Sequence, residues 1–534
     1  MSVGLHILNG DGSEMTRKDK EFQKIPQSEE EDIRMNLARS FNAGQHLETW
    51  RDAIKGNPKA LGWCFFSLFS CIMWGYDGLA SSIVLAIGQF RKDYGNDNFR
   101  QGEYIIPVIW QLGLGAASLF GLLFGGVGAG FVSKKWGRQI CMAVSYSLSI
   151  AGVFLQYYSS PGNMPMLFGG KVLAGIPLGV FITIAPTYCA EIAPFALRGS
   201  VTAAVNWSLV LGQCLAYVVM RQTQYSDGPN AYLILFAIQW VFAGAALLAL
   251  PFFPESPYHL VSQGRIEKAK KNIRRLRKSG FDVDGYIASI EVDLETQART
   301  EREASFKECF RGKNSKRTLI AMSTFFIQSI CGIGWIIGYM AYFLQLGGLS
   351  EASSFDATVA LSFLMLLGNM AGWIFVEKFG RRDTALYGCI TLASSLFLIG
   401  ISATIPSKKA IWAQVSFMAV WSFTYQSTIG SVAWPIVTEV SKSSLRGHTQ
   451  SLATVTQGLV GAVSGVSLPF LVNPDQLNMG GRVAFIYGGI LGFSCLGVWR
   501  YYPETKGRTF EEIDRLFEMG INTRRFKQTK LAAE

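Results

Sequence analysis

Charged residues are scarce in this chain, and so are histidines. Asp, Glu, Lys and Arg together make up 16% of its 534 residues, and there are four histidines. A soluble domain usually carries about 25% charged residues. Hydrophobic residues supply 49% of the chain, and the mean hydropathy is +0.24. This composition argues against an ordinary soluble enzyme and favours a chain that is largely embedded in a membrane.

Motifs of common enzyme chemistries are missing as well. No histidine lies in the middle of an apolar run, and the nine cysteines form no CxxC pair, metal-ligand spacing or disulfide framework. No GxSxG, nucleotide-binding or zinc motif occurs in a suitable context. The triplet Asn206-Trp207-Ser208 matches a glycosylation acceptor but lies inside an apolar run. We therefore predict no catalytic residue, no metal site and no cofactor.

The ends of the chain are polar, and they carry much of its positive charge. Residues 1–60 contain no apolar segment of the kind that a signal peptide needs, so the first apolar run is expected to be an uncleaved anchor. The net charge is +11, but 31 of the 49 Lys and Arg lie in 1–60, 258–317 and 502–534. Basic tails and loops around apolar runs are typical of membrane proteins, so nucleic acid is not expected as a partner.

Apolar runs of about 20 residues, long enough to cross a bilayer, recur along the chain. Twelve spans are expected, at 61–85, 106–131, 139–158, 166–189, 201–220, 232–253, 318–344, 356–377, 384–404, 411–438, 449–471 and 482–501. An even number puts both termini on one side, and the basic tails and loop predict that this side is cytoplasmic. The stretch 264–278 is read as a basic amphipathic helix with a solvated face.

Three pairs of short motifs indicate an internal duplication. KKWGR at 134–138 matches EKFGRR at 377–382, and Glu191 with Arg198-Gly199 matches Glu439 with Arg446-Gly447. Pro254-Glu255-Ser256 likewise matches Pro503-Glu504-Thr505, and the matches are separated by 243 to 249 residues. Two parallel repeats with a substrate site between them are a transporter architecture.

The predicted fold class is therefore an all-α membrane protein with twelve transmembrane helices in two six-helix halves. The expected divisions are a cytoplasmic tail at 1–60, an N-terminal half at 61–257, a cytoplasmic helical loop at 258–317, a C-terminal half at 318–502 and a cytoplasmic tail at 503–534. Nothing in the sequence points to an oligomer, and a monomer is expected.

The repeated charged residues sit at the expected cytoplasmic ends of helices. Ion pairs among them, within and between the halves, would hold that side closed and break as it opens. The predicted gating residues are Arg138, Glu191, Arg198, Glu255, Glu377, Arg381, Glu439, Arg446 and Glu504. The alternative is that these arginines act only as topology signals, but acids at matched spacing favour gating.

These motifs resemble those of the sugar porter family of the major facilitator superfamily over nearly all of 61–510. The matching segments are Gly75-Tyr76-Asp77, Pro107 to Gln111, Gly170 to Gly175, Pro186 to Gly199, Pro254 to Pro257 and Pro503 to Gly507. Within that family, the chain looks most like the fungal α-glucoside (maltose-type) permeases. The segments that carry this finer resemblance are Val205-Asn206, Gly212-Gln213, Gly338-Tyr339, Tyr342-Phe343 and Leu468 to Pro474.

Several positions depart from the family pattern. Lys134 stands where the family usually has Asp, and Lys171 stands where it has Arg. A lysine at position 171 keeps the positive charge but cannot form the two parallel hydrogen bonds that an arginine gives to a carboxylate. In the seventh span the family often shows Gln-Gln and then Gly-x-Asn, whereas this chain has Gln328-Ser329 and then a Gly-Ile-Gly series at 332–334. Fewer amides imply a different or less polar substrate than glucose.

Asp77 is the only acid in the first span, and Lys171 is the only basic residue in the interior of the fourth. Charges inside a membrane are costly and mark functional sites by default. The resemblance implies that the two face each other as a proton-coupling acid and its partner. The alternative is a static ion pair in a proton-independent carrier.

Sugar recognition needs amides for hydroxyl groups and aromatic faces for C–H surfaces. By resemblance, the candidate substrate-binding residues are Gln111, Asn206, Gln213, Gln328, Ser329, Tyr339 and Trp434. The alternative for each residue is that its side chain only forms an ordinary interhelical hydrogen bond or packing contact and does not bind substrate. The predicted function is proton symport of a sugar, an α-glucoside such as maltose, across a fungal plasma membrane.

Two other functions stay open. One is a proton-independent facilitator or exporter of another polar small molecule, such as a polyol, an organic acid or a pathway metabolite. The other is a non-transporting sugar sensor, which the short segment after the last span disfavours. The expected partners are the sugar, the proton and the lipid bilayer.

Overall fold

The structure is a computed structural model of the chain. It describes residues 27–529 apart from short gaps at 48, 99–102, 224, 227, 279, 304 and 474–475. The first part of the predicted N-terminal tail, the last residues of the predicted C-terminal tail, and Pro474 of the α-glucoside-type segment therefore lie outside the described residues.

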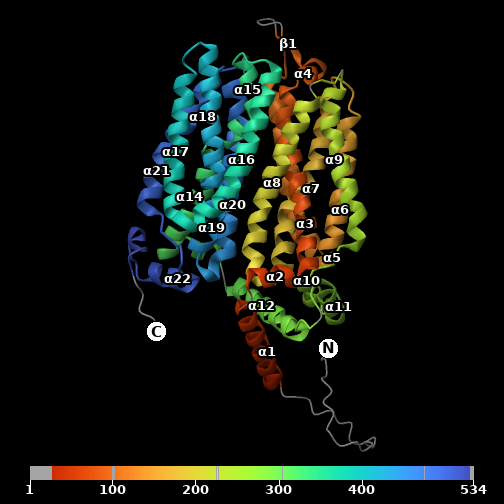
Figure 1. The fold of residues 1–534 in the computed structure, drawn as a ribbon, viewed down its shortest axis with the longest axis vertical. Helices are drawn as coiled ribbons and strands as arrows, with labels where there is room; N and C mark the ends of the chain where they lie inside the picture. Colours follow the sequence, from red (N-terminus) through yellow and green to blue (C-terminus); the bar gives the residue numbers. More distant parts are fainter. Residues whose placement is uncertain are drawn as a thin grey trace, which may run out of the picture.

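Long helices form two bundles that stand side by side (Figure 1). The first bundle contains α3 (Pro58–Ile83), α5 (Val108–Trp136), α6 (Arg138–Tyr157), α7 (Met164–Ile192), α8 (Phe195–Thr223) and α9 (Asn230–Ala249). The second contains α14 (Gly312–Ile330), the π-helical turn η3 (Gly334–Gly338), α15 (Tyr339–Leu346), α16 (Glu351–Phe379), α17 (Arg381–Ser402), α18 (Lys408–Ser427), α19 (Ile429–Val440), α20 (Arg446–Val472) and α21 (Val483–Tyr501). We call them the N-terminal and C-terminal halves.

Short elements distinguish the two ends of the molecule (Figure 1). One end, here the tail end, carries α1 (Gln27–Leu47), α2 (Trp50–Gly56), α10 (Pro257–Ser262), α11 (Ile266–Leu276), α12 (Val283–Glu303), α13 (Phe306–Cys309) and α22 (Phe510–Glu518). The opposite end, here the hairpin end, carries α4 (Gly88–Tyr94) and the antiparallel strands β1 (Asn96–Asn98) and β2 (Glu103–Ile105). The remaining 3₁₀ turns are η1 (Val84–Ala86), η2 (Leu250–Phe252), η4 (Ser443–Leu445), η5 (Gly480–Arg482) and η6 (Thr523–Arg525).

Within the described residues, eleven helical segments are long and apolar enough to cross a membrane. Many of their large apolar side chains point outward, such as Phe131 (76% exposed), Leu248 (80%) and Phe493 (78%). A soluble protein rarely exposes so much apolar surface, whereas lipid covers it. The predicted all-helical membrane fold is confirmed, with the short β1–β2 pairing as an addition that the sequence analysis did not include.

The tenth expected span, 411–438, is not one continuous helix. It is divided at Thr428 into α18 and α19. The hydroxyl of Ser431 donates to the carbonyl of Gln426 (2.6 Å), which a regular helix would offer to the Gly430 amide. Pro435 supplies no amide hydrogen in the next turn. This competition for backbone groups accounts for the break.

The internal duplication has a common three-dimensional basis. Gly137 (φ +93°) and Gly380 (φ +92°) directly precede α6 and α17 in a backbone conformation that side chains rarely adopt. The Glu255 carboxylate accepts the first two amides of α6 at 2.9 and 3.1 Å. Glu504 does the same for α17 at 3.0 and 3.2 Å. A carboxylate at a helix N-terminus satisfies free amides and complements the helix dipole.

A neutral imidazole lies beside the first of these caps. A side-chain Cβ added at Gly137 would lie 3.1 Å from Nε2 of His259 in α10. Burial lowers the pKa of His259, so at neutral pH the ring contributes no positive charge beside Glu255. The cap is thus an interaction between Glu255 and helix amides.

We expect Gly380→Ala to destabilise the protein. A Cβ there would lie 2.4 Å from the Glu504 carboxylate, and the backbone conformation is one that only glycine adopts freely. The loss should be at least about 1 kcal/mol, seen as a lower melting temperature of the purified protein. Gly169→Ala, with open space around its Cβ position, is the control and should leave melting unchanged or slightly higher. Equal melting of the two variants would contradict the role of Gly380.

Candidate transport site

A buried ion pair lies in the N-terminal half. Lys171 Nζ of α7 is 3.0 Å from Asp77 Oδ1 of α3, and the two side chains are 1% and 2% exposed. The ammonium group also lies 5.2 Å from the centre of the Phe236 ring, on α9. Two residues that are 94 positions apart thus meet, as the sequence analysis expected. A charge pair in such surroundings is costly unless each charge keeps its partner.

Close packing of small residues places Lys171 in the interior. Along the contact between α5 and α7, a Cβ on Gly125 would lie 1.9 Å from the Ile176 carbonyl oxygen. A Cβ on Gly179 would lie 2.1 Å from the Leu122 carbonyl oxygen. Glycines let the two backbones approach closely, as in other membrane helix pairs. The chain around Lys171 is therefore fixed by backbone contact.

Amide and hydroxyl groups gather between α14 and α20 in the C-terminal half. Gln328 Oε1 accepts a hydrogen bond from Gln457 Nε2 at 2.8 Å. The hydroxyl of Ser329 donates to the Gln457 carbonyl oxygen at 3.4 Å. Gln328 and Ser329 are 8% and 9% exposed. The two predicted residues are thus held together by Gln457, which the sequence analysis did not select.

The same region contains a second helix break. Gly332 has a φ of +92°, so α14 ends before it and a π-helical turn follows. The Cys331 carbonyl oxygen, freed by the break, accepts a hydrogen bond from Trp421 Nε1 at 3.1 Å. Trp421 in turn stacks on Tyr425, with ring centroids 5.1 Å apart. Broken helices inside membranes occur where protein surrounds them, and in transporters they line substrate sites.

The other predicted substrate residues lie on α8, α15 and α19. Asn206 and Gln213 on α8 are half-buried, as is Tyr339 on α15. Within the described residues, the Gln213 Oε1 atom is buried without a hydrogen-bond partner. Trp434 on α19 is 46% exposed and packs edge-on against Phe325, at 4.7 Å between centroids. A buried acceptor without a donor, such as Gln213 Oε1, can accept a ligand hydroxyl.

Gln111 has a different environment from the other amides. Its Nε2 donates to Asn473 Oδ1 at 2.9 Å and to the Ile106 carbonyl oxygen at 2.8 Å. Tyr342 donates to the same Asn473 oxygen at 3.1 Å. Asn473, which is 1% exposed, therefore joins α5 of one half to α15 of the other. In this conformation Gln111 belongs to a contact between halves at the hairpin end.

Further polar contacts join the halves at the same end. The Gly88 amide donates to Glu351 at 3.1 Å, and Arg91 donates to Gln345 at 3.0 Å. Deeper in the bundle, Tyr217 donates to the Ile337 carbonyl oxygen. Arg221 and Asp356 form an ion pair between α8 and α16. These contacts close the hairpin end of the molecule.

The predicted gating residues at the tail end pair within each half. Arg138 contacts Glu191 at 2.6 Å in the N-terminal half, and Arg381 contacts Glu439 at 2.8 Å in the C-terminal half. The two pairs occupy equivalent positions in the repeat. A gating role that involves contacts between the halves therefore requires a conformation other than this one.

The other predicted gating residues differ from one another in their neighbours and their exposure. Glu255 and Glu504 cap helices, as described above, and Glu377 is exposed. Arg198 is half-buried, and its Nε atom has no hydrogen-bond partner within the described residues. The guanidinium of Arg446 lies 4.0 Å from the centre of the Phe510 ring, which α22 supplies. The last contact links the C-terminal tail to the repeated motif.

A comparison with protein-family models agrees with this arrangement. The model described as "Sugar (and other) transporter" matches residues 63–517. The chain belongs to this sugar porter family of the major facilitator superfamily. It is a multi-pass membrane transporter and not an enzyme, as the sequence analysis predicted.

Relatives of this transporter at similar sequence identity carry names that describe different functions or none. It is 29% identical over 500 residues to the general alpha-glucoside permease of Saccharomyces cerevisiae, covering 92% of this chain and 80% of that protein. It is 31% identical over 510 residues to the MFS transporter fmqE of Aspergillus fumigatus, covering 92% and 94%. Among solved structures, the xylose transporter XylE from E. coli, in a partially occluded inward open conformation, matches with a TM-score of 0.70 and 19% identity, covering 85% of this chain and all of that one. The last match supports the fold.

The sequence analysis missed two residues that organise this transporter. Gln457 is a polar residue inside an expected span, a signal that could have selected it. Asn473 was noted only as part of a family segment. Its contact with Gln111 joins residues that are 362 positions apart, which no local pattern reveals.

We expect Asn473→Ala to favour opening of the hairpin end. The change removes the shared acceptor of Gln111 and Tyr342, and an unpaired buried group costs about 1–3 kcal/mol. Spin labels at Asn230→Cys and Lys409→Cys, on exposed positions of opposite halves, would report longer distances. Of the nine native cysteines, eight are buried, which limits background labelling.

The control for this measurement is Asn163→Ala. Asn163 caps α7 inside the N-terminal half, where its side chain accepts a hydrogen bond from the Met166 amide. Its variant should keep the original distances. If Asn473→Ala also keeps them, Asn473 does not hold the halves together.

Proposed function

We propose that this transporter carries an α-glucoside, such as maltose, into the cell together with a proton, by alternating access across the plasma membrane. The observation that carries the proposal is the buried pair of Asp77 and Lys171, because a membrane-embedded acid with a single cationic partner is suited to gain and lose a proton. The permease relatives and the amides of both halves support the sugar part of the proposal.

The tail end is proposed to face the cytoplasm. It carries the basic helix α11 and the described parts of the N-terminal and C-terminal tails. Cytoplasmic segments of membrane proteins are enriched in Lys and Arg. The hairpin end would then face outward. Since the contacts between halves close the hairpin end, the conformation described here would be one that releases substrate to the inside.

Proton coupling follows from the balance of charges at Asp77. The Lys171 ammonium lies 3.0 Å from the Asp77 carboxylate, so in this conformation each buried charge is balanced by the other. If α3 and α7 move apart during the cycle, the Coulomb attraction weakens with distance and Asp77 takes up a proton. When the pair closes again, the proton leaves. A cycle of this kind couples helix movement to proton transfer, whereas a permanently closed pair would be structural only.

Substrate recognition is proposed to use amides from both halves. Gln328 and Gln457 offer donors and acceptors from the C-terminal half, and the Gln213 Oε1 atom is a free acceptor in the N-terminal half within the described residues. Trp434 presents a half-exposed aromatic ring. Ser329 is shorter than the glutamine usual in the family, which leaves space for a second sugar ring or a less polar group.

A second candidate is transport of another polar small molecule without proton coupling. Two observations favour it: the seventh span has lost amides that sugar porters usually carry, and a relative as similar as the permeases is named only as an MFS transporter. A panel of labelled substrates, tested in proteoliposomes with and without a pH gradient, distinguishes the two candidates.

We expect Asp77→Asn to abolish substrate uptake against a concentration gradient while leaving intact the exchange of substrate inside the vesicle for substrate outside. The Asn amide does not ionise and so cannot gain and lose a proton during the cycle, whereas the sugar site is unchanged. Uptake of labelled maltose into proteoliposomes under an inward proton gradient measures the effect. The control is Asp93→Asn, because Asp93 is a half-buried acid of the same half that accepts a hydrogen bond from Tyr232. Gradient-driven accumulation by Asp77→Asn at the control level would exclude Asp77 as the coupling acid.

We expect Gln328→Ala to weaken binding of every sugar and Ser329→Gln to narrow the range toward monosaccharides. Loss of a buried hydrogen-bond partner costs about 1–3 kcal/mol, or roughly a ten- to hundredfold rise in the apparent affinity constant. Competition between labelled maltose and unlabelled sugars measures both effects. Gln263→Ala, at the tail end, is the control and should change neither. The α-glucoside assignment fails if glucose outcompetes every disaccharide and Ser329→Gln alters nothing.

A further inference from the structure

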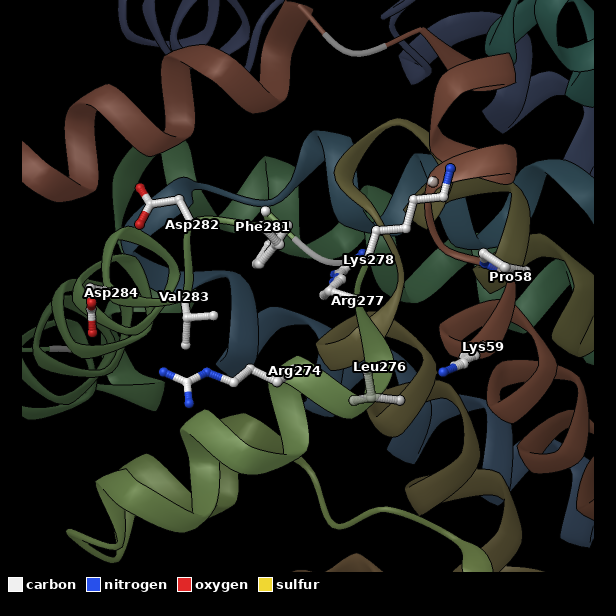
Figure 2. A pocket seen from close by; sticks show the side chains of 12 residues that line it. Pro58, Lys59, Arg274, Leu276, Arg277, Lys278, Phe281, Asp282, Val283 and Asp284 are labelled. Atoms are coloured by element: carbon white, nitrogen blue, oxygen red, sulfur yellow. The ribbon is translucent and has the colours of Figure 1, made fainter.

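A basic recess lies at the tail end of the N-terminal half. It has a volume of about 800 Å³ and lies between the start of α3 and the segment that joins α11 to α12. Four basic residues line it, namely Lys59, Arg274, Arg277 and Lys278. Figure 2 shows their side chains around one hollow, with Lys59 on α3 and the others on the end of α11 and the segment after it. The transport mechanism above uses none of them.

Some charged residues of the recess already have partners. Arg277 is buried and donates to the Asn57 side chain at 2.8 Å, so it fixes the start of α3. Asp282 accepts a backbone amide of α12 at 2.9 Å, and Asp284 pairs with Lys270 at 2.9 Å. The two acids are therefore occupied by contacts of their own.

The other three cations have no such partner. Lys59, Arg274 and Lys278 are exposed and form no ion pair with any described residue. They come from two separate elements and line the same recess from different sides (Figure 2). Guanidinium and ammonium groups bind phosphate oxygens through charge-assisted hydrogen bonds. The recess is thus suited to a group that carries one or more phosphates.

Apolar side chains continue upward from the recess on the outer surface. Phe65, less than two turns above Lys59 on α3, is 69% exposed. The end of α9 lies beside this part of α3, because Phe66 and Phe253 have ring centroids 5.4 Å apart. The neighbouring Phe252 is 64% exposed. Exposed apolar side chains on α3, the helix that also supplies Lys59 to the recess, and after α9 suit a molecule with a phosphate head and hydrocarbon chains.

The helix before α3 has the character of a membrane-surface helix. Trp50 and Ile54 of α2 are one turn apart and are 58% and 44% exposed. Exposed Arg51 and Lys55 accompany them. Tryptophan with flanking cations is typical of the boundary between lipid and water. Arg275 also reaches this boundary, since it donates to the Phe252 carbonyl oxygen at 3.0 Å.

We propose that this recess binds the phosphorylated headgroup of an anionic phospholipid, with Lys59, Arg274 and Lys278 as its ligands. The acyl chains lie along the exposed faces of Phe65 and Phe252. An anionic lipid is preferred over a free phosphate compound because the recess lies beside apolar surface. The site is separate from the transport site and does not depend on which substrate is carried.

The test uses the full-length protein in nanodiscs of phosphatidylcholine that contain a few per cent of phosphatidylinositol 4,5-bisphosphate. Native mass spectrometry counts the phosphoinositide retained by the wild type and by Lys59→Gln/Arg274→Gln/Lys278→Gln. Near a membrane surface each lost cation matters, and three should weaken retention roughly tenfold to a hundredfold. The control removes three exposed cations at the tail end of the other half, Lys307→Gln/Arg311→Gln/Lys378→Gln, and should retain the lipid.

A charge-keeping variant, Lys59→Arg/Arg274→Lys/Lys278→Arg, separates loss of charge from misfolding and should retain most of the lipid. Equal retention by the wild type and the glutamine triple variant overturns the proposal. It is overturned as well if inositol hexakisphosphate, which has no acyl chains, displaces the lipid at equal concentration, because the site would then be one for a soluble phosphate compound. Failure of the charge-keeping variant to retain lipid also counts against it.

Discussion

In the hydrocarbon layer, the backbone of a chain has to satisfy its own hydrogen bonds, because no water is available to do so. This constraint explains why long helices build nearly all of the molecule and where they are interrupted. At Gly332 and Thr428 the helices break in the interior of the C-terminal half, and side chains such as Trp421 and Ser431 take up the backbone groups. At Gly137 and Gly380 the helices restart, with Glu255 and Glu504 on their first amides.

The two halves use the same scaffold for different tasks. Each has an acid on a helix start and an Arg–Glu pair at the tail end, so the architecture is common to both. The buried ion pair is in the N-terminal half, whereas the helix breaks and the Gln328–Gln457 amide pair are in the C-terminal half. In the proposed cycle, proton binding and most sugar recognition are therefore on opposite sides of the interface. Movement between the halves is what would couple them.

The sequence predicted much of this arrangement because the relevant signals are local. An acid or a base in an apolar run stands out, and so Asp77 and Lys171 could be selected before their contact was known. The repeat could be found because its motifs lie at helix ends, where the same chemistry recurs. The family and the all-helical fold were predicted correctly from these patterns.

Other features could not be predicted, since they depend on which distant groups meet. Gln111 has the same sequence signal as Gln213, yet it bonds to Asn473 at the contact between halves. The division of the tenth span depends on whether the Ser431 hydroxyl or an amide reaches the Gln426 carbonyl oxygen, which hydropathy does not encode. The phosphate-suited recess combines Lys59 with residues more than 200 positions later, so the sequence gives only a diffuse basic loop.

The contacts between the halves lie toward one end of the molecule, so the halves can rotate about that end. α5 and α16 each have 29 residues, which is about 43 Å of helix, and the polar contacts that join the halves lie toward the hairpin end. A rotation of about 10° around that end would separate the far tips of such helices by about 7 Å, given this length. A few hydrogen bonds near the axis of rotation can therefore control an opening wide enough for a sugar, while each Arg–Glu pair stays within its own half.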